Sequence, residues 1–151
     1  MKKTQKRLGN KGFSLVELIV VIAIMAVLVG VLAPTLIRNV EKSRESKDAQ
    51  NIDSIKNAIE VALQDETAYA EAVPVAATPG AAVTAKTIVT VQSGSGDTDV
   101  TITGTNVKKQ LDATLDTSKM KLTSKKYKAS GVKVEFKVDA DGHVSIVETG
   151  L

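Results

Sequence analysis

The hydrophobic pattern of the chain is dominated by one uninterrupted apolar segment near its start. No polar side chain occurs among the sixteen residues from Leu18 to Ala33, which as a helix would extend about 24 Å at 1.5 Å per residue. With Phe13 to Val16 added, the segment approaches the roughly 20 residues that cross a bilayer. Glu17 lies within it, and a carboxylate in hydrocarbon is costly enough to indicate a function. The pattern therefore predicts a membrane-spanning helix with a functional acid near its start.

Beyond Pro34 the chain becomes strongly charged while its helical spacing continues. The charged residues of this region are Arg38, Glu41, Lys42, Arg44, Glu45, Lys47 and Asp48. Several are three or four residues apart, so opposite charges can pair along one helix face. This region is interpreted as a solvated helix at the membrane surface.

A buried helix face is expected next. Apolar residues recur at helical steps, with Leu63 beside them: Ile52, Ile55, Ile59 and Ala62. Such a stripe predicts one face packed against the rest of the chain. One long helix is expected from Phe13 to about Asp65, interrupted only by Pro34. It should end between Asp65 and Ala70, because prolines follow.

The remainder of the chain predicts short strands around one short helix. Residues 71–86 are expected to form a loop, and 87–91 and 99–103 to form a hairpin across the loop 93–97. Val107, Leu111 and Leu115 are four apart, which predicts a helix with Asn106 as its N-cap. Residues 132–138 and 144–147 alternate around an Asp-Gly turn and predict a second hairpin. The expected sheet of about four antiparallel strands can cover the isoleucine stripe.

The expected fold class is therefore α+β. A long N-terminal helix, half membrane-spanning and half amphipathic, packs against a small antiparallel sheet. The expected division is residues 1–12 as a leader, 13–37 as the membrane helix, 38–70 as the amphipathic helix and 71–151 as the loop and sheet region.

Charge is distributed very unevenly along the chain. The formal net charge is +3, but five of the 20 Lys and Arg residues precede Phe13 and all 17 acids follow it. A chain beginning at Phe13 would hold 15 cations against 17 acids. The positive net charge is thus due to the first twelve residues and is no evidence for nucleic-acid binding. With four Phe and Tyr residues and no Trp, a base-stacking surface is not expected either.

Three interpretations of the N-terminus compete. A secretory signal peptide needs a small-residue cleavage site after its apolar run, but here Ala33 is followed by Pro34 and the helix pattern continues. A plain membrane anchor with cytoplasmic positive charges does not explain Gly12, Phe13 and Glu17. The third is a leader cut before the apolar segment. The stretch Lys-Gly-Phe-Ser-Leu-Val-Glu-Leu from Lys11 onward resembles the class III signal of type IV pilins and pseudopilins.

That resemblance implies a processing site and an assembly site. It implies that an aspartyl prepilin peptidase cuts between Gly12 and Phe13 and then N-methylates Phe13. It also implies that Glu17 pairs with the Phe13 amine of an adjacent subunit. Such a pair would compensate two charges at low dielectric and set the register between subunits. A helix spine with a sheet on its C-terminal half is likewise what the resemblance implies.

Gly30 and Pro34 predict a helix kink. Pro34 lacks the N–H that would bond the Gly30 carbonyl, so the weakest helix former and the strongest breaker act on one hydrogen bond. A kink is tolerated in many membrane helices. The resemblance further implies local unwinding of this region in a filament.

No catalytic or cofactor site is predicted. Asp139 and Asp141 beside Gly142 could touch calcium, but the ligand spacing of a calcium loop is absent, and a hairpin turn is the preferred interpretation. His143 is the only histidine and no cysteine occurs, so no zinc site is expected. The chain is predicted to be no enzyme, to hold no metal and to need no cofactor.

The leading functional prediction is a prepilin that becomes the structural subunit of a type IV pilus, supporting adhesion, motility or DNA uptake. The alternatives are a pseudopilin of a type II secretion or competence system, and a membrane-tethered binding module that never polymerises. Expected partners are copies of the chain in a helical filament, the peptidase, and an assembly ATPase with its membrane platform. The precursor is expected in the cytoplasmic membrane and the filament outside the cell.

Overall fold

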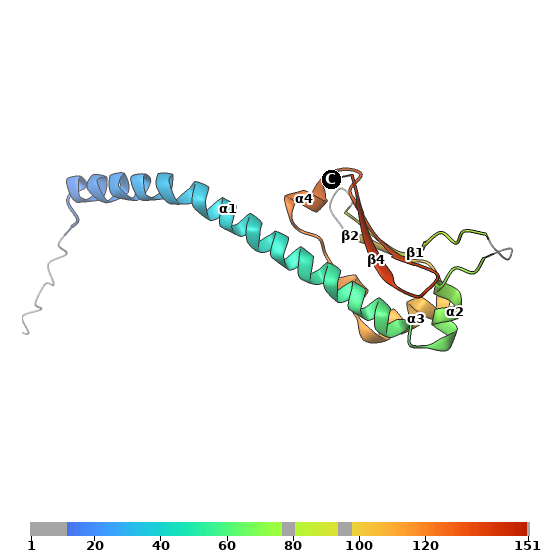
Figure 1. The fold of residues 1–151 in the computed structure, drawn as a ribbon. Coiled ribbons are helices and arrows are strands. Elements are labelled where there is room, and N and C mark those ends of the chain that lie inside the picture. Colours follow the sequence, from blue (N-terminus) through green and yellow to red (C-terminus); the bar gives the residue numbers. More distant parts are fainter. Residues whose placement is uncertain (1–11, 77–80, 94–97, 151) are drawn as a thin grey trace, which may run out of the picture. The chain divides into compact units, whose positions relative to one another are not determined.

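A computed structural model describes residues 12–76, 81–93 and 98–150, and the chain divides into two units, Met1–Asn39 and Val40–Leu151. Helix α1, Leu15–Ala62, belongs to both units (Figure 1). It begins two residues later and ends three residues earlier than predicted. The helix continues through Pro34 and is not interrupted there, because a proline removes a single ladder hydrogen bond. Whether Gly30 and Pro34 bend the helix remains a prediction.

A second helix that the sequence analysis did not predict follows α1. The N–H groups of Gln64 and Asp65 bond the carbonyls of Val61 and Ala62 at 3.1 and 3.2 Å, which closes a tight turn. The Asp65 carboxylate then accepts hydrogen bonds from the backbone N–H groups of Thr67 and Ala68 and caps helix α2, Glu66–Ala72. Aspartate is preferred at an N-cap over a helix interior. The predicted helix to residue 70 and the predicted loop from residue 71 were therefore wrong at this junction.

The four predicted strands form one antiparallel sheet. They are β1 Lys86–Ser93, β2 Thr98–Ile102, β3 Lys133–Val138 and β4 Val144–Thr149, in the spatial order β2-β1-β3-β4. Val91 of β1 lies opposite Val100 on one side and Val134 on the other. Of the predicted loop 93–97, Ser93 belongs to β1, and residues 94–97 lie outside the described residues. Both hairpins and the sheet of four strands are confirmed.

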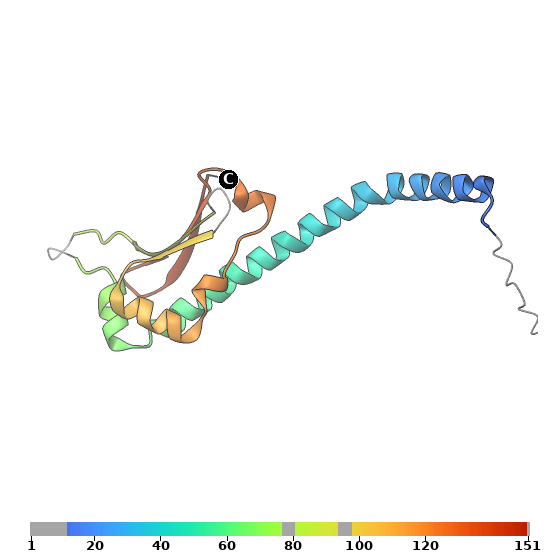
Figure 2. The same ribbon diagram turned by 180° about the vertical axis from the view of Figure 1, so that it is seen from behind.

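Between β2 and β3 the chain forms three short helical segments. They are α3 Thr105–Thr114, the 3-10 turn Thr117–Lys119 and α4 Lys125–Lys128. The two central strands, β1 and β3, are therefore distant in sequence but pair directly in the sheet. Figure 2 shows the same arrangement from behind.

One apolar core holds the second unit together. Ile55 and Ile59 of α1 are 1% and 0% exposed and share a core cluster with Val134 and Phe136 of the sheet. Val107 and Leu111 of α3 are also fully buried in this cluster, and Leu115 packs partly buried at its edge. The predicted contact between the isoleucine stripe and the sheet is confirmed.

The N-terminus of α3 is capped by a distant side chain and not by Asn106 as predicted. The Glu71 carboxylate of α2 accepts hydrogen bonds from the backbone N–H groups of Thr105 and Asn106, both at 2.7 Å. The residue before the helix is Gly104 with φ +111°, where a Cβ would lie 2.9 Å from the Glu71 side chain. The hydrogen bond from Thr105 N–H is the main cause that lowers the pKa of Glu71. An anion at a helix start is favourable, so Glu71 joins α2 to α3.

Candidate processing and assembly site

The residues around the predicted cleavage point stand free of the rest of the described chain. Gly12, Phe13 and Ser14 precede helix α1 and belong to no helix or strand, and Phe13 is 90% exposed. A Cβ built on Gly12 would meet no atom within 4 Å, and Gly12 does not have a positive φ. Neither packing nor backbone conformation in the described chain therefore requires glycine at this position.

Glu17 has a local partner that the sequence analysis missed. One oxygen of its carboxylate accepts a hydrogen bond from the backbone N–H of Ser14 at 2.9 Å. Ser14 directly precedes the first helical residue and Glu17 is the third, so the pair has the spacing of a capping box. The Ser-x-x-Glu pattern in the sequence could have identified this role. Glu17 thus lies one helical turn from Phe13 and caps α1 in the isolated chain.

The apolar part of α1 is uncovered along its whole length. Large apolar side chains from Leu15 to Ile37 are each more than half exposed. By length and composition the helix could cross a membrane. Apolar surface of this extent needs lipid or other protein chains around it. The exposed apolar side chains of this unit therefore require contact with lipid or with other protein chains.

Gly30 and Pro34 lie well along this apolar segment. Gly30 is thirteen positions after Glu17, which is about 20 Å of helix at 1.5 Å per residue. A Cβ on Gly30 would meet no atom within 4 Å. The Arg38 side chain donates from Nε to the Pro34 carbonyl at 3.5 Å. Gly12, Phe13 and Glu17 thus form one group at the start of α1, and Gly30 and Pro34 form a separate pair.

Three polar side chains of α1 hold a segment that is distant in sequence. The buried Asp48 carboxylate accepts from the backbone N–H groups of Thr123 and Ser124 at 2.8 to 3.0 Å. Asn51 donates to the Lys121 carbonyl at 3.0 Å. Glu41 accepts from the Lys125 backbone N–H, and its other oxygen pairs with Arg44 at 3.5 Å.

These contacts change the interpretation of the charged half of α1. The expected pair between Glu41 and Arg44 is present, but the region is not simply solvated, because Asp48 is 0% exposed. Positions 41, 48 and 55 recur every seven residues, which keeps them on one helix face. Extending the isoleucine stripe backwards by this spacing could have found Glu41 and Asp48.

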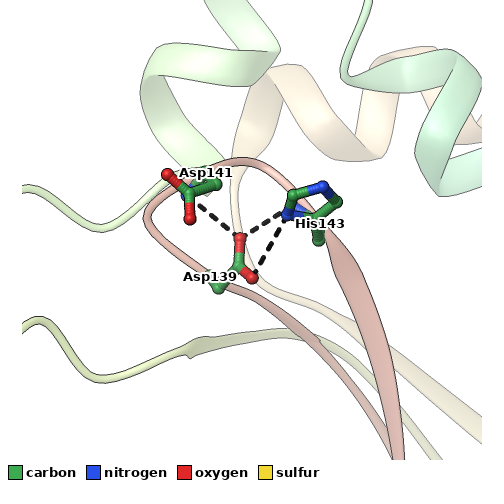
Figure 3. A group of neighbouring side chains, drawn as sticks. All are labelled: Asp139, Asp141 and His143. Carbon is green, nitrogen blue, oxygen red and sulfur yellow. Dashed lines mark hydrogen bonds and ion pairs between the residues drawn. The ribbon is translucent and has the colours of Figure 1, made fainter.

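The β3–β4 turn brings together Asp139, Asp141 and His143 (Figure 3). Asp139 accepts hydrogen bonds from the backbone N–H groups of Asp141 and His143 at 3.0 and 2.8 Å. The bond from His143 N–H is the main cause that lowers the pKa of Asp139. Gly142 has φ +84°, a conformation that favours glycine. One carboxylate and one glycine therefore account for this turn as part of the hairpin.

One comparison with known proteins matches the N-terminal segment of the chain. The family model described as the prokaryotic N-terminal methylation motif matches residues 7–33, a range that contains Gly12, Phe13, Glu17 and Gly30. No solved structure matches the chain significantly.

Two curated relatives carry the same printed name, type II secretion system core protein G. The protein from Vibrio cholerae serotype O1 is 33% identical over 69 residues, which is 46% of this chain and 45% of that protein. The protein from Aeromonas hydrophila is 35% identical over 65 residues, which is 43% of this chain and 45% of that protein. The chain thus spans less than half the length of each relative. Its methylation motif, its relatives and its α+β layout together make the chain similar to type IV pilins and pseudopilins over its N-terminal part.

Proposed function

We propose that this chain is the precursor of a pseudopilin, a structural subunit of the short filament of a type II secretion system. The observation that carries the proposal is that both curated relatives are named as core protein G of such a system. Among the functions weighed from the sequence, this was the alternative, and the comparisons favour it over the leading prediction of a pilus. The role is structural, and the chemistry on the chain is performed by other proteins.

Maturation in this proposal removes residues 1–12 and methylates Phe13. Gly12 and Phe13 belong to no helix or strand, and Phe13 is 90% exposed, which supports it, because a protease must bind an exposed segment that it can draw into its cleft. Since nothing in the described chain requires glycine at position 12, a requirement for glycine would come from the peptidase. A residue without a side chain lets the backbone enter a narrow cleft.

Assembly in this proposal exchanges the partner of Glu17. In the precursor its carboxylate bonds the Ser14 N–H. Cleavage would create a positively charged amine at Phe13, directly before Ser14. In a bundle of apolar helices that ammonium needs a counterion, and removing one partner of a buried ion pair costs about 3–5 kcal/mol. Pairing with the Glu17 of a neighbouring copy would supply the counterion and fix the register. Gly30 and Pro34 would ease local unwinding as the helices pack.

The proposal implies several partners and a change of location. Copies of the chain, a prepilin peptidase, an assembly ATPase and a membrane platform would act on it in turn. The precursor would lie in the cytoplasmic membrane through the apolar part of α1, and the assembled subunit would leave it. A pilus displayed at the cell surface uses the same maturation steps, so the motif alone does not separate these two filaments.

Deletion of the gene tests the proposed system directly. We expect the deletion to retain in the cell the proteins that type II secretion exports, while sheared surface pili keep their normal amount. Measuring both the culture-medium proteins and the sheared pili in the same strains decides the matter, with the intact gene restored as the control. Lost pili with unchanged export would support the pilus function instead. Loss of neither would favour a tethered module that does not polymerise.

A further inference from the structure

One stretch of the second unit carries a concentrated positive charge that the proposed function does not use. Residues 117–134, called the basic segment here, contain no acid and six lysines: Lys119, Lys121, Lys125, Lys126, Lys128 and Lys133. The unit Val40–Leu151 holds 14 of the chain's 20 cations and 16 of its 17 acids. Without the basic segment the rest of the unit has eight cations against 16 acids. Charge is therefore segregated within this unit.

The hydrogen bonds to α1 fix the place of the basic segment. The hydrogen bonds follow the segment in order. Asn51 binds Lys121, Asp48 binds Thr123 and Ser124, and Glu41 binds Lys125. The segment thus runs antiparallel to α1, towards the end of the unit that follows the apolar helix. Helix α4 comes last and lies at this end, while α2 lies at the opposite end in both Figure 1 and Figure 2.

Five acids lie at the opposite end of the unit, while Glu41, Asp48 and Glu148 bind the basic segment itself. Asp65, Glu66 and Glu71 belong to α2 or its cap. The β3–β4 turn with Asp139 and Asp141 adjoins this helix, because a Cβ on Gly142 would lie 2.9 Å from the Tyr69 ring. The end of the unit that holds α4, called the basic end here, is thus the end at which α1 enters the unit, and α2 and the β3–β4 turn form the other end.

The chain itself keeps the basic end close to the membrane boundary. Ile37 is the last residue of the predicted membrane helix, and Glu41 follows four residues later. Even a fully extended backbone would separate them by only about 14 Å. The headgroup layers extend roughly 5 to 8 Å beyond the hydrocarbon on each side. Lysine side chains on a helix bound to Glu41 can therefore reach the lipid phosphates.

We propose that α4 and its lysines dock on the anionic phosphate headgroups of the membrane while the chain is still a membrane-anchored precursor. The inference rests on the anchored precursor of the proposed function. Lys125 and Lys128 are its main contacts, since both are exposed and neither forms an ion pair within the described residues. Lys126 is partly engaged, because it pairs with Glu148 at 2.9 Å. Each lysine near an anionic surface should strengthen docking about fivefold.

The test measures how close α4 lies to the headgroups. The chain has no cysteine, so Ala129→Cys provides one exposed site for a fluorophore directly after α4. The full chain is reconstituted in vesicles that contain a headgroup nitroxide as quencher. The vesicles are either neutral phosphatidylcholine or phosphatidylcholine mixed with anionic phosphatidylglycerol. We expect strong quenching only in the anionic vesicles, and its loss at about 1 M salt, where the Debye length is about 3 Å.

Matched charge variants identify the contacts. Lys125→Gln with Lys128→Gln should lower the ratio of docked to undocked chain roughly 25-fold in anionic vesicles. Lys108→Gln with Lys109→Gln removes the same charge from α3 and should leave the ratio nearly unchanged. Equal quenching in neutral and anionic vesicles, or equal effects of both double variants, would overturn the proposal. Quenching that follows protein concentration instead of lipid charge would assign the basic end to another copy of the chain, and would overturn it too.

A second label separates this inference from the function on which it rests. Ala26→Cys places the fluorophore in the apolar part of α1, where a quencher on the lipid acyl chains reports insertion. Quenching at position 26 without quenching at position 129 would refute the docking of α4 alone. Absence of quenching at position 26 would refute the anchored precursor and with it the docking.

Discussion

Replacing Ile55 by aspartate should unfold the second unit of the chain. Ile55 is 1% exposed in the centre of the helix–sheet core, and no cation lies among the core residues to pair with a carboxylate there. The substitution removes a buried side chain, at a cost of about 2–5 kcal/mol, and buries an unpaired carboxyl group, at a further cost of several kcal/mol. Since domains of this size are stable by roughly 5–15 kcal/mol, the variant should be largely or wholly unfolded.

The measurement needs the second unit in water. Among the described residues, the buried apolar side chains lie between Ile52 and Val138, so a truncated chain beginning at Arg38 should retain this core and fold as a monomer. Urea unfolding followed by circular dichroism then compares Ile55→Asp with Val61→Asp on the same helix. Val61 is 49% exposed, and its replacement should cost less than about 1 kcal/mol. Equal midpoints for Ile55→Asp and the parent chain would show that the core has been misassigned.

Replacing Glu17 by alanine should abolish filament assembly while leaving maturation intact. The substitution removes an acid from an apolar helix, so insertion in the bilayer should be unchanged or improved. Loss of the hydrogen bond from the Ser14 N–H should destabilise the first turn of the helix by about 1 kcal/mol at most. In the filament, however, each Phe13 ammonium would lose its counterion, at about 3–5 kcal/mol for every subunit contact.

The assay expresses Glu17→Ala with the assembly machinery and compares sheared filaments with cell-bound mature subunit. Glu45→Ala is the matched control, because it removes an exposed acid from the same helix outside the apolar part. Filament yield should fall sharply for Glu17→Ala alone, with cleavage after Gly12 unaffected in both. Normal filaments from Glu17→Ala would reduce Glu17 to a helix cap and remove the pairing from the mechanism.

Local periodicity in the sequence was enough to predict most of the fold. The isoleucine stripe, the alternating residues of β3 and the Asp-Gly turn each depend on neighbours in sequence, and each was found in its predicted role. Caps were predicted less well. Asn106 is a residue type that often caps helices, but here the Glu71 side chain, from another helix, accepts the hydrogen bonds of the first N–H groups of α3. No pattern near Asn106 shows this, because the two residues meet only through the tertiary fold.

The polar contacts of α1 were hidden for the same reason. Asp48 resembles one more charge on a solvated helix until residues 123 and 124 are folded against it. The residues proposed for processing and assembly could be identified more easily, because they lie close together in the sequence. Gly12, Phe13 and Glu17 form a contiguous motif, so the sequence alone indicates them. Their proposed partners are a peptidase and a second copy of the chain, and for this reason a single folded chain cannot display the contacts that would give them their function.

The central claim is that this chain becomes a filament subunit after its leader is removed at one peptide bond. The intact mass of the subunit in purified filaments tests it most directly. The account predicts a subunit that begins at Phe13 and is heavier by a single methyl group than its sequence, with fragmentation placing that group on the Phe13 nitrogen. A subunit that retains residues 1–12, one that begins after Ala33, or filaments that lack the chain altogether would contradict the account.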